Sequence, residues 1–179
     1  MKSSKLLAAL PALAALLCTK ISVLACTGGA LIAKDGGVAV GRTLEFGKAL
    51  DSVLAIWPAG SEFTGQTATG ANGLKWKSQY GFLGPTAATH HDMLIDGLND
   101  QGLNVGLFYF PGYAQYAEAT PENAAKGLAP AQVAAWILSN CANVAEVKSK
   151  IGEVALLPVV LDIIGIVPDL HIKVQDATG

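Results

Sequence analysis

Residues 26–44 read CTGGALIAKDGGVAVGRTL, and this stretch decides how the N-terminal part of the chain folds. Two apolar runs, 29–33 and 37–44, flank Lys34-Asp35-Gly36. An Asp-Gly pair between two apolar runs predicts a β-hairpin, because both turn positions favour positive φ. A turn centred near Asp35-Gly36 places Gly29 opposite Arg42. The hairpin would therefore bring Arg42 within side-chain reach of Cys26.

The segment in front of Cys26 has the form of a bacterial secretion signal. Lys2 and Lys5 precede an apolar run over 6–17, and the segment ends with Val23-Leu24-Ala25, which suits a signal peptidase. We therefore predict a signal peptide over 1–25 and an exported protein, periplasmic or secreted. Cys26 would be the first residue of the mature chain. Its thiol and its free α-amino group would then share one carbon atom, as in an N-terminal-nucleophile amidase.

Cys26 has two other interpretations. Val-Leu-Ala-Cys resembles a lipobox, so Cys26 could anchor a lipoprotein, although Leu24 fits a lipobox poorly. Cys26 could also be a residue that simply follows the cleavage site. A lipoprotein usually continues with a flexible polar linker, whereas here an apolar strand is predicted from Gly29 onward.

Two charged residues on the return strand are candidates for the chemistry of Cys26. A guanidinium at Arg42 would favour thiolate over thiol, which is how a cysteine is activated. Glu45 could hold the α-amino group or Arg42 by a charge-assisted hydrogen bond. Taken alone, Arg42 and Glu45 would also be an ordinary surface pair.

Composition limits the class of protein. The length fits one domain over 26–179. That segment carries nine basic and fourteen acidic side chains, a net charge of about −5, which argues against nucleic acid or an anionic membrane as a partner. Cys141 lies in an apolar helical pattern, so we expect a buried structural thiol. No cofactor is predicted, and adjacent His90-His91 would point to opposite faces of a strand, which argues against a metal site.

The rest of the chain changes from β to α patterning at Pro130. Strands are predicted over 53–57, 74–82, 92–96 and 103–109, and a last one begins at Leu170. Apolar residues on both faces of 103–109 suggest a sheet covered on both sides. Helices are predicted from Pro130 to about Asn140 and over 144–151 after an Asn143 cap. The turn residues 176–179 end the chain without a following strand, so we expect a fragment of a longer protein.

Four elements together resemble the choloylglycine hydrolase family, which contains bile salt hydrolases and penicillin V acylases. They are Cys26-Thr-Gly, Gly41-Arg-Thr-Leu-Glu-Phe46, Asp96-Gly-Leu-Asn-Asp-Gln-Gly-Leu103 and Gly106-Leu-Phe-Tyr-Phe-Pro-Gly112. Their order and spacing match the N-terminal half of that family. The resemblance implies an α+β protein with the four-layer αββα N-terminal-nucleophile fold, of which only the N-terminal half is present.

The same resemblance implies function. It implies hydrolysis of a linear amide in a small N-acyl substrate, with Cys26 as nucleophile and its α-amine as base. Arg42 matches the arginine beside the thiol, and Glu45 stands where an aspartate usually contacts the α-amine. Tyr109 would provide one oxyanion N–H and favours an aromatic or fatty acyl group over a bile salt. Family members are often tetramers, so a homo-oligomer is also implied.

Two consequences remain to be tested. The family places a second oxyanion donor and a further arginine in its C-terminal half, beyond residue 179. We therefore expect no measurable activity from the 179-residue chain alone. The alternative function is a lipid-anchored or catalytically inactive binding module tethered through Cys26.

Overall fold

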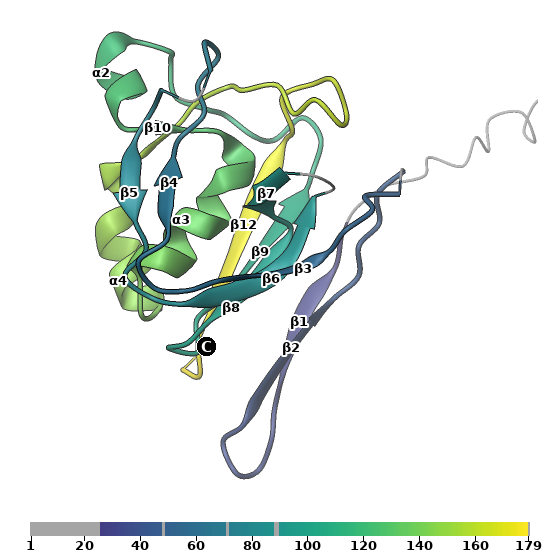
Figure 1. Cartoon of the computed structure of the whole chain (residues 1–179). Helices are drawn as coiled ribbons and strands as arrows, with labels where there is room; N and C mark the ends of the chain where they lie inside the picture. Colours follow the sequence, from purple (N-terminus) through teal and green to yellow (C-terminus); the bar gives the residue numbers. More distant parts are fainter. Residues whose placement is uncertain (1–25, 48, 71, 88–89, 179) are drawn as a thin grey trace, which may run out of the picture.

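A twisted antiparallel sheet forms the centre of the molecule (Figure 1). The computed structural model describes residues 26–47, 49–70, 72–87 and 90–178, so the predicted signal peptide lies outside the described residues. The strand order is β12-β9-β8-β6-β3, and β7 pairs with β6 beside this path. The strands of this sheet are β3 (Leu54–Trp57), β6 (Phe82–Ala87), β7 (His90–Leu94), β8 (Asp96–Asn99), β9 (Asn104–Tyr109) and β12 (Leu170–Gln175).

Helices cover one face of this sheet (Figure 1). The 3-10 turn η1 (Pro130–Gln132) leads into α3 (Val133–Asn140), which packs on β7, β8 and β9. Pro130 fits the first turn because proline lacks the N–H that a helix start leaves unpaired. The predicted helix from Pro130 to Asn140 is therefore confirmed. No helix in the described ranges is both long and apolar enough to cross a bilayer.

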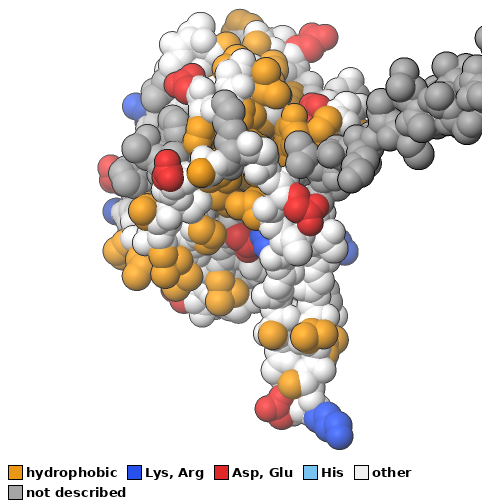
Figure 2. All heavy atoms as spheres, turned by 90° about the vertical axis from the view of Figure 1, so that its right-hand side faces the viewer, with side chains coloured by type: hydrophobic (Ala, Val, Ile, Leu, Met, Phe, Trp, Pro, Cys, Tyr) orange, Lys and Arg blue, Asp and Glu red, His pale blue; other side chains and the backbone are white. Residues whose placement is uncertain are grey.

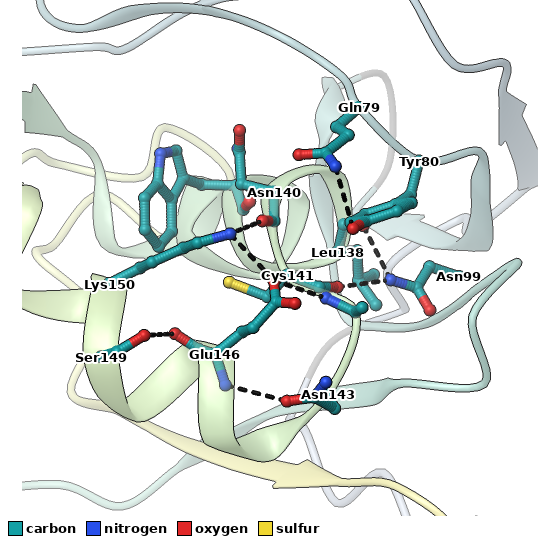
Figure 3. Close-up of polar contacts among 12 residues, drawn as sticks. Gln79, Tyr80, Asn99, Leu138, Asn140, Cys141, Asn143, Glu146, Ser149 and Lys150 are labelled. Carbon is teal, nitrogen blue, oxygen red and sulfur yellow. Dashed lines mark hydrogen bonds and ion pairs between the residues drawn. The ribbon is translucent and has the colours of Figure 1, made fainter.

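Gly97 allows the close approach of α3 to the sheet. A Cβ atom at Gly97 would lie 2.4 Å from Cδ1 of Leu138. Asn99, two residues further along β8, donates to the carbonyls of Leu138 and Cys141 at 3.0 and 2.8 Å (Figure 3). These bonds satisfy carbonyls at the end of α3 that have no partner within the helix.

A second helix, α4 (Val144–Lys150), begins at the predicted cap. The Asn143 side chain accepts from the N–H of Glu146 at 2.9 Å, and Glu146 accepts from the N–H of Ala142 at 3.2 Å. Lys150 pairs with Glu146 at 2.8 Å (Figure 3). The capping interaction predicted at Asn143 is therefore confirmed. The remaining short elements are α2 (Pro121–Ala125), η2 (Ile151–Glu153), β10 (Gly127–Leu128) and β11 (Ala155–Leu156).

The predicted hairpin forms β1 (Gly28–Ile32) and β2 (Val38–Arg42) and projects away from the body of the molecule (Figure 1). Its register differs by one residue from the prediction, because Gly28 and not Gly29 lies opposite Arg42. The cause is the turn: of its two central residues only Gly36 has positive φ, at +87°, and its N–H donates to the Ala33 carbonyl. Among the described residues, β1 and β2 pair only with each other.

Two strand predictions are wrong in detail. The segment 74–82 is not one strand: β5 (Lys75–Lys77) pairs with β4 (Glu62–Thr64), and β6 starts at Phe82. Between them, the N–H groups of Gln79 and Tyr80 donate to the carbonyl of Ser139 at the end of α3. These two bonds to α3 hold the segment in which the chain passes from the β4–β5 pair to β6 of the central sheet.

The partner of β9 is also shifted. The residues predicted to pair with it were 92–96, whereas β8 (Asp96–Asn99) pairs with β9 and β7 pairs with β6. The chain changes partners at Ile95, whose carbonyl accepts from the N–H of Leu107 at 2.9 Å. The side chains of β9 do alternate as predicted, with Val105 and Leu107 buried on the α3 side.

The opposite face of the sheet is largely open at β3, β6 and β8, whereas on β9, for which cover on both sides was predicted, Phe108 is only partly exposed and contacts Arg42. Leu54 and Ile56 on β3 are 69% and 72% exposed, and Leu83 and Leu98 are 41% and 45% exposed. Hydrophobic side chains gather on the body of the molecule beside the hairpin in Figure 2. No described element covers these apolar side chains of β3, β6 and β8.

Candidate active site

A concave apolar pocket lies beside Cys26, where the hairpin meets the sheet. It encloses about 530 Å³ of empty space, part of which is open to solvent. Residues from three separate parts of the chain line it. The sheet contributes Met93, Leu94, Ile95, Leu107, Tyr109 and Leu170, the segment after β2 contributes Leu44, Phe46 and Leu50, and the segments around β12 and α3 contribute Ala131, Leu161, Ile164 and Pro168. Cys26 completes the lining.

The base of the hairpin positions Cys26. The next residue, Thr27, donates its N–H to Oγ1 of Thr43 at 3.1 Å, and its carbonyl accepts from the N–H of Thr43 at 2.8 Å. These bonds tie the chain to β2 immediately after Cys26. The thiol is free and partly buried. Cys26 is therefore held at the pocket by the ordered strand that begins two residues after it.

Arg42 joins the hairpin to the sheet behind this pocket. Its Nη1 donates to the carbonyls of Leu107 at 2.7 Å and Ile95 at 3.3 Å. Its Cζ lies 4.4 Å from the centroid of the Phe108 ring, a cation–π contact. Nη2 is buried and makes no hydrogen bond to any described residue. A buried donor without a partner is costly, so Nη2 is available to an anionic or carbonyl group placed beside it.

The backbone N–H of Tyr109 points to the same edge of β9 as Arg42. Successive residues of an antiparallel strand direct their N–H and C=O groups to alternate sides. Phe110 donates to Asp169 on the β12 side, whereas Leu107 donates to Ile95 on the β8 side. Tyr109, two residues after Leu107, therefore directs its N–H to the β8 side. The last β8–β9 pair is Asp96 with Gly106, so this N–H lies beyond the paired part of β8.

The structure thus brings three of the four predicted site residues together. Cys26 and Tyr109 line one pocket, and Arg42 holds the carbonyls of two residues of its wall. Glu45 is different: it is exposed, and it forms no hydrogen bond or ion pair with another described residue. Its proposed contact with the α-amino group of Cys26 requires the processed chain and stays a prediction.

Sequence reasoning missed most of the pocket wall. Leu161 and Ile164 come from a segment in which the sequence indicated no site residue. Phe46 was quoted as part of a motif, but its role is to pack edge-on against Tyr109, with ring centroids 5.9 Å apart. A signal did exist for Phe46, since apolar Leu44 and Phe46 alternate with polar neighbours directly after β2.

Cys141 contrasts with Cys26. It is fully buried at the end of α3. Burial raises the pKa of the Cys141 thiol to about 11, because desolvation disfavours the thiolate. A thiol in that state is a poor nucleophile. The predicted burial of Cys141 is therefore confirmed, and its raised pKa fits a structural role.

The chain is similar in sequence to a family of amide hydrolases and to individual proteins. The family of linear amide C–N hydrolases called the choloylglycine hydrolase family matches residues 26–179. A bile salt hydrolase/transferase of Clostridium perfringens is 25% identical over 157 residues, and an uncharacterized protein of Paramecium bursaria Chlorella virus 1 is 30% identical over 154 residues. Each match covers 86% of this chain but 46% of the relative.

Solved structures share the fold of this chain. A cysteine-to-alanine mutant of the conjugated bile acid hydrolase from Clostridium perfringens superposes with a TM-score of 0.71 at 22% identity, over 87% of this chain and 46% of that one. Penicillin V acylase from Agrobacterium tumefaciens gives 0.65 at 25% identity, over 85% and 44%. The chain spans less than half the length of these proteins.

The fold is that of the N-terminal-nucleophile hydrolases, the four-layer αββα class, and this chain contains the N-terminal half of it. The chain belongs to the choloylglycine hydrolase family of linear amide C–N hydrolases.

Proposed function

We propose that the longer protein containing this chain hydrolyses a linear, non-peptide amide with Cys26 as an N-terminal nucleophile. The observation that carries the proposal is the placement of Cys26 in a pocket beside Tyr109, with Arg42 behind its wall. The family match also starts at residue 26. Export and removal of 1–25 would expose the α-amino group that the reaction requires.

The chemistry follows from these positions. The α-amine of Cys26 takes the thiol proton, and Sγ attacks the amide carbonyl carbon. The N–H of Tyr109 donates to the resulting oxyanion, and the free Nη2 of Arg42 lies on the same edge of β9. The C–N bond breaks as the α-amine passes the proton to the leaving nitrogen, which gives a thioester and a free amine. Water, deprotonated by the α-amine, then hydrolyses the thioester and releases the acid.

The test combines chemistry with processing. Mass spectrometry of the exported protein is expected to show a chain that starts at an unblocked Cys26, and Cys26→Ser is expected to abolish turnover of N-acyl amides such as penicillin V or glycine-conjugated bile salts. Tyr109→Phe is the matched control. It should retain turnover, because it keeps the backbone N–H and the ring. A retained Met1, or a lipid on Cys26, would contradict the proposal and favour an anchored binding module.

The attachment of Thr27 to Thr43 already favours the nucleophile over the anchor. A lipid anchor needs a flexible tether between the membrane and the folded domain. Here the ordered hairpin begins within two residues of Cys26. Labelled palmitate therefore should not enter the protein, and the protein should not partition into detergent.

A further inference from the structure

We propose that the pocket beside Cys26 selects a hydrocarbon acyl group without polar substituents and discriminates against hydroxylated acyl groups, such as those of hydroxylated steroids. This inference rests on the function proposed above and adds the class of acyl group to it.

The chemistry of the pocket wall is the first argument. Of the side chains that line the pocket, all are hydrocarbon or thioether except the thiol of Cys26 and the hydroxyl of Tyr109. Cys26 is assigned to the reacting carbonyl, so it cannot serve a distant substituent. A buried hydroxyl that loses water needs a new hydrogen-bond partner. The described wall offers it one side-chain hydroxyl.

The backbone of the wall is the second argument. The carbonyls of Ile95 and Leu107, which would be natural acceptors for a substrate hydroxyl, are both occupied by Nη1 of Arg42. The carbonyl of Leu161 accepts from Ile164 and Gly165, and its N–H donates to Ile166. These three carbonyls of the wall are therefore already used within the protein, while its hydrocarbon side chains line the pocket.

The third argument is the rigidity of the wall. Met93, Leu94 and Pro168 are almost completely buried, so they cannot turn aside to admit water or a polar group. Leu161 forms an isolated bridge with Ile166, which fixes the turn that carries Ile164. A pocket of this kind buries much of an apolar ligand's surface and contains few partners for a polar ligand.

The experiment compares two ligands that share the amine and the chain length. N-decanoylglycine is compared with the analogue that carries a hydroxyl near the far end of the acyl chain. Binding is measured by calorimetry on the Cys26→Ala form of the full-length mature protein, and kcat/KM on the unmodified enzyme. We expect the plain chain to be favoured about 10- to 100-fold in both measurements, the range typical of a hydroxyl forced into an apolar pocket.

A matched set of variants locates the effect in the wall. Ile164→Thr places a hydroxyl in the pocket and should reduce the preference several-fold. Ile164→Val removes the same volume without a hydroxyl, so it should weaken both ligands equally and leave the ratio unchanged. Ile166→Thr lies two residues away, 49% exposed and outside the pocket, and should change neither ligand.

The outcomes separate this inference from the proposed function. Selective binding without any hydrolysis would overturn the proposed function and support the pocket assignment. Hydrolysis of both ligands with equal kcat/KM, or a preference for the hydroxylated chain, would overturn the pocket assignment alone. Binding of neither ligand to the Cys26→Ala protein would also overturn it.

Discussion

The two faces of the central sheet differ in cover although they share the same strands. On β6, Phe82 is 3% exposed under the helix layer, whereas its neighbour Leu83 is 41% exposed on the opposite face. On β8, Gly97 faces α3 and Leu98 faces the open side. Side chains of the same apolar type therefore occur in two different environments.

This difference shows which interactions complete the fold. A strand that is apolar on both faces is typical of a sheet buried between two layers. One layer, built by α3 and α4, is present in this chain (Figure 1). Relatives with the same fold are more than twice as long as the matched region, so we expect their additional length to supply the second sheet of the αββα sandwich. The open face is the surface that this second sheet would bury.

The largest effect is expected on the helix-covered face. Leu138→Ala removes a fully buried side chain of α3 that packs against β8. We expect the longer protein to lose about 2–5 kcal/mol of unfolding free energy, because a cavity remains in a close-packed core. Denaturant unfolding measures this loss, and a change below about 1 kcal/mol would contradict the assignment of this face as the main core.

The open face provides the sharper test. Leu98→Ala would cost less than about 0.5 kcal/mol if this face is exposed in solution, as for most surface substitutions. If a second sheet covers it in the longer protein, the cost rises to about 2–4 kcal/mol. We expect the larger value, and a loss near zero would show that the face stays open.

A glycine packed against α3 and a glycine on the projecting hairpin should respond differently to substitution by alanine. Gly97→Ala places a Cβ within 2.4 Å of Leu138, so we expect a loss of about 1–3 kcal/mol from overpacking. Gly29→Ala on the hairpin is the matched control, because no described atom lies within 4 Å of a Cβ there and its φ is not positive. Equal losses in the two variants, measured by thermal unfolding, would argue against close packing at Gly97.

The smallest effect is a pH dependence of stability that comes from Cys141, which is buried at the end of α3. The pKa of Cys141 is raised to about 11 in the folded state from an ordinary value of 9.0, because burial disfavours the thiolate. The unfolded chain therefore loses this proton first, and stability should fall as pH rises from about 9 toward 11. Cys141→Ala should lack this component. In the native protein at pH 8, iodoacetamide should modify Cys26 and leave Cys141 unmodified.

Local signals in the sequence were sufficient for several elements. The strand predicted from Leu170 is β12, and the helix predicted from Pro130 ends at Asn140 as expected. The Asn143 cap and the Asp35-Gly36 hairpin were also correct in kind. Each of these depends on residues close together in the chain, namely a proline at a helix start, a capping side chain or a glycine turn.

Features that depend on distant residues were not predictable in the same way. The hairpin register is a local exception, and it differed by one residue because only one turn residue adopts positive φ. The pocket could not be derived, since Phe46, Ile95 and Ile164 meet only after the sheet and its connections have formed. Cys26 was identified from the predicted signal cleavage, Arg42 from the hairpin and Tyr109 from the motif resemblance. The sequence pattern did not indicate the two backbone carbonyls that Arg42 binds.

The projecting hairpin has a consequence for handling the chain in solution. The outer edges of its two strands pair with no other described strand, and Leu31 and Ile32 near its tip are 78% and 72% exposed. An exposed, apolar strand edge is a template for intermolecular pairing and aggregation. Copies of this chain whose hairpins remain uncovered are therefore expected to join edge to edge, and their solubility should fall steeply with concentration.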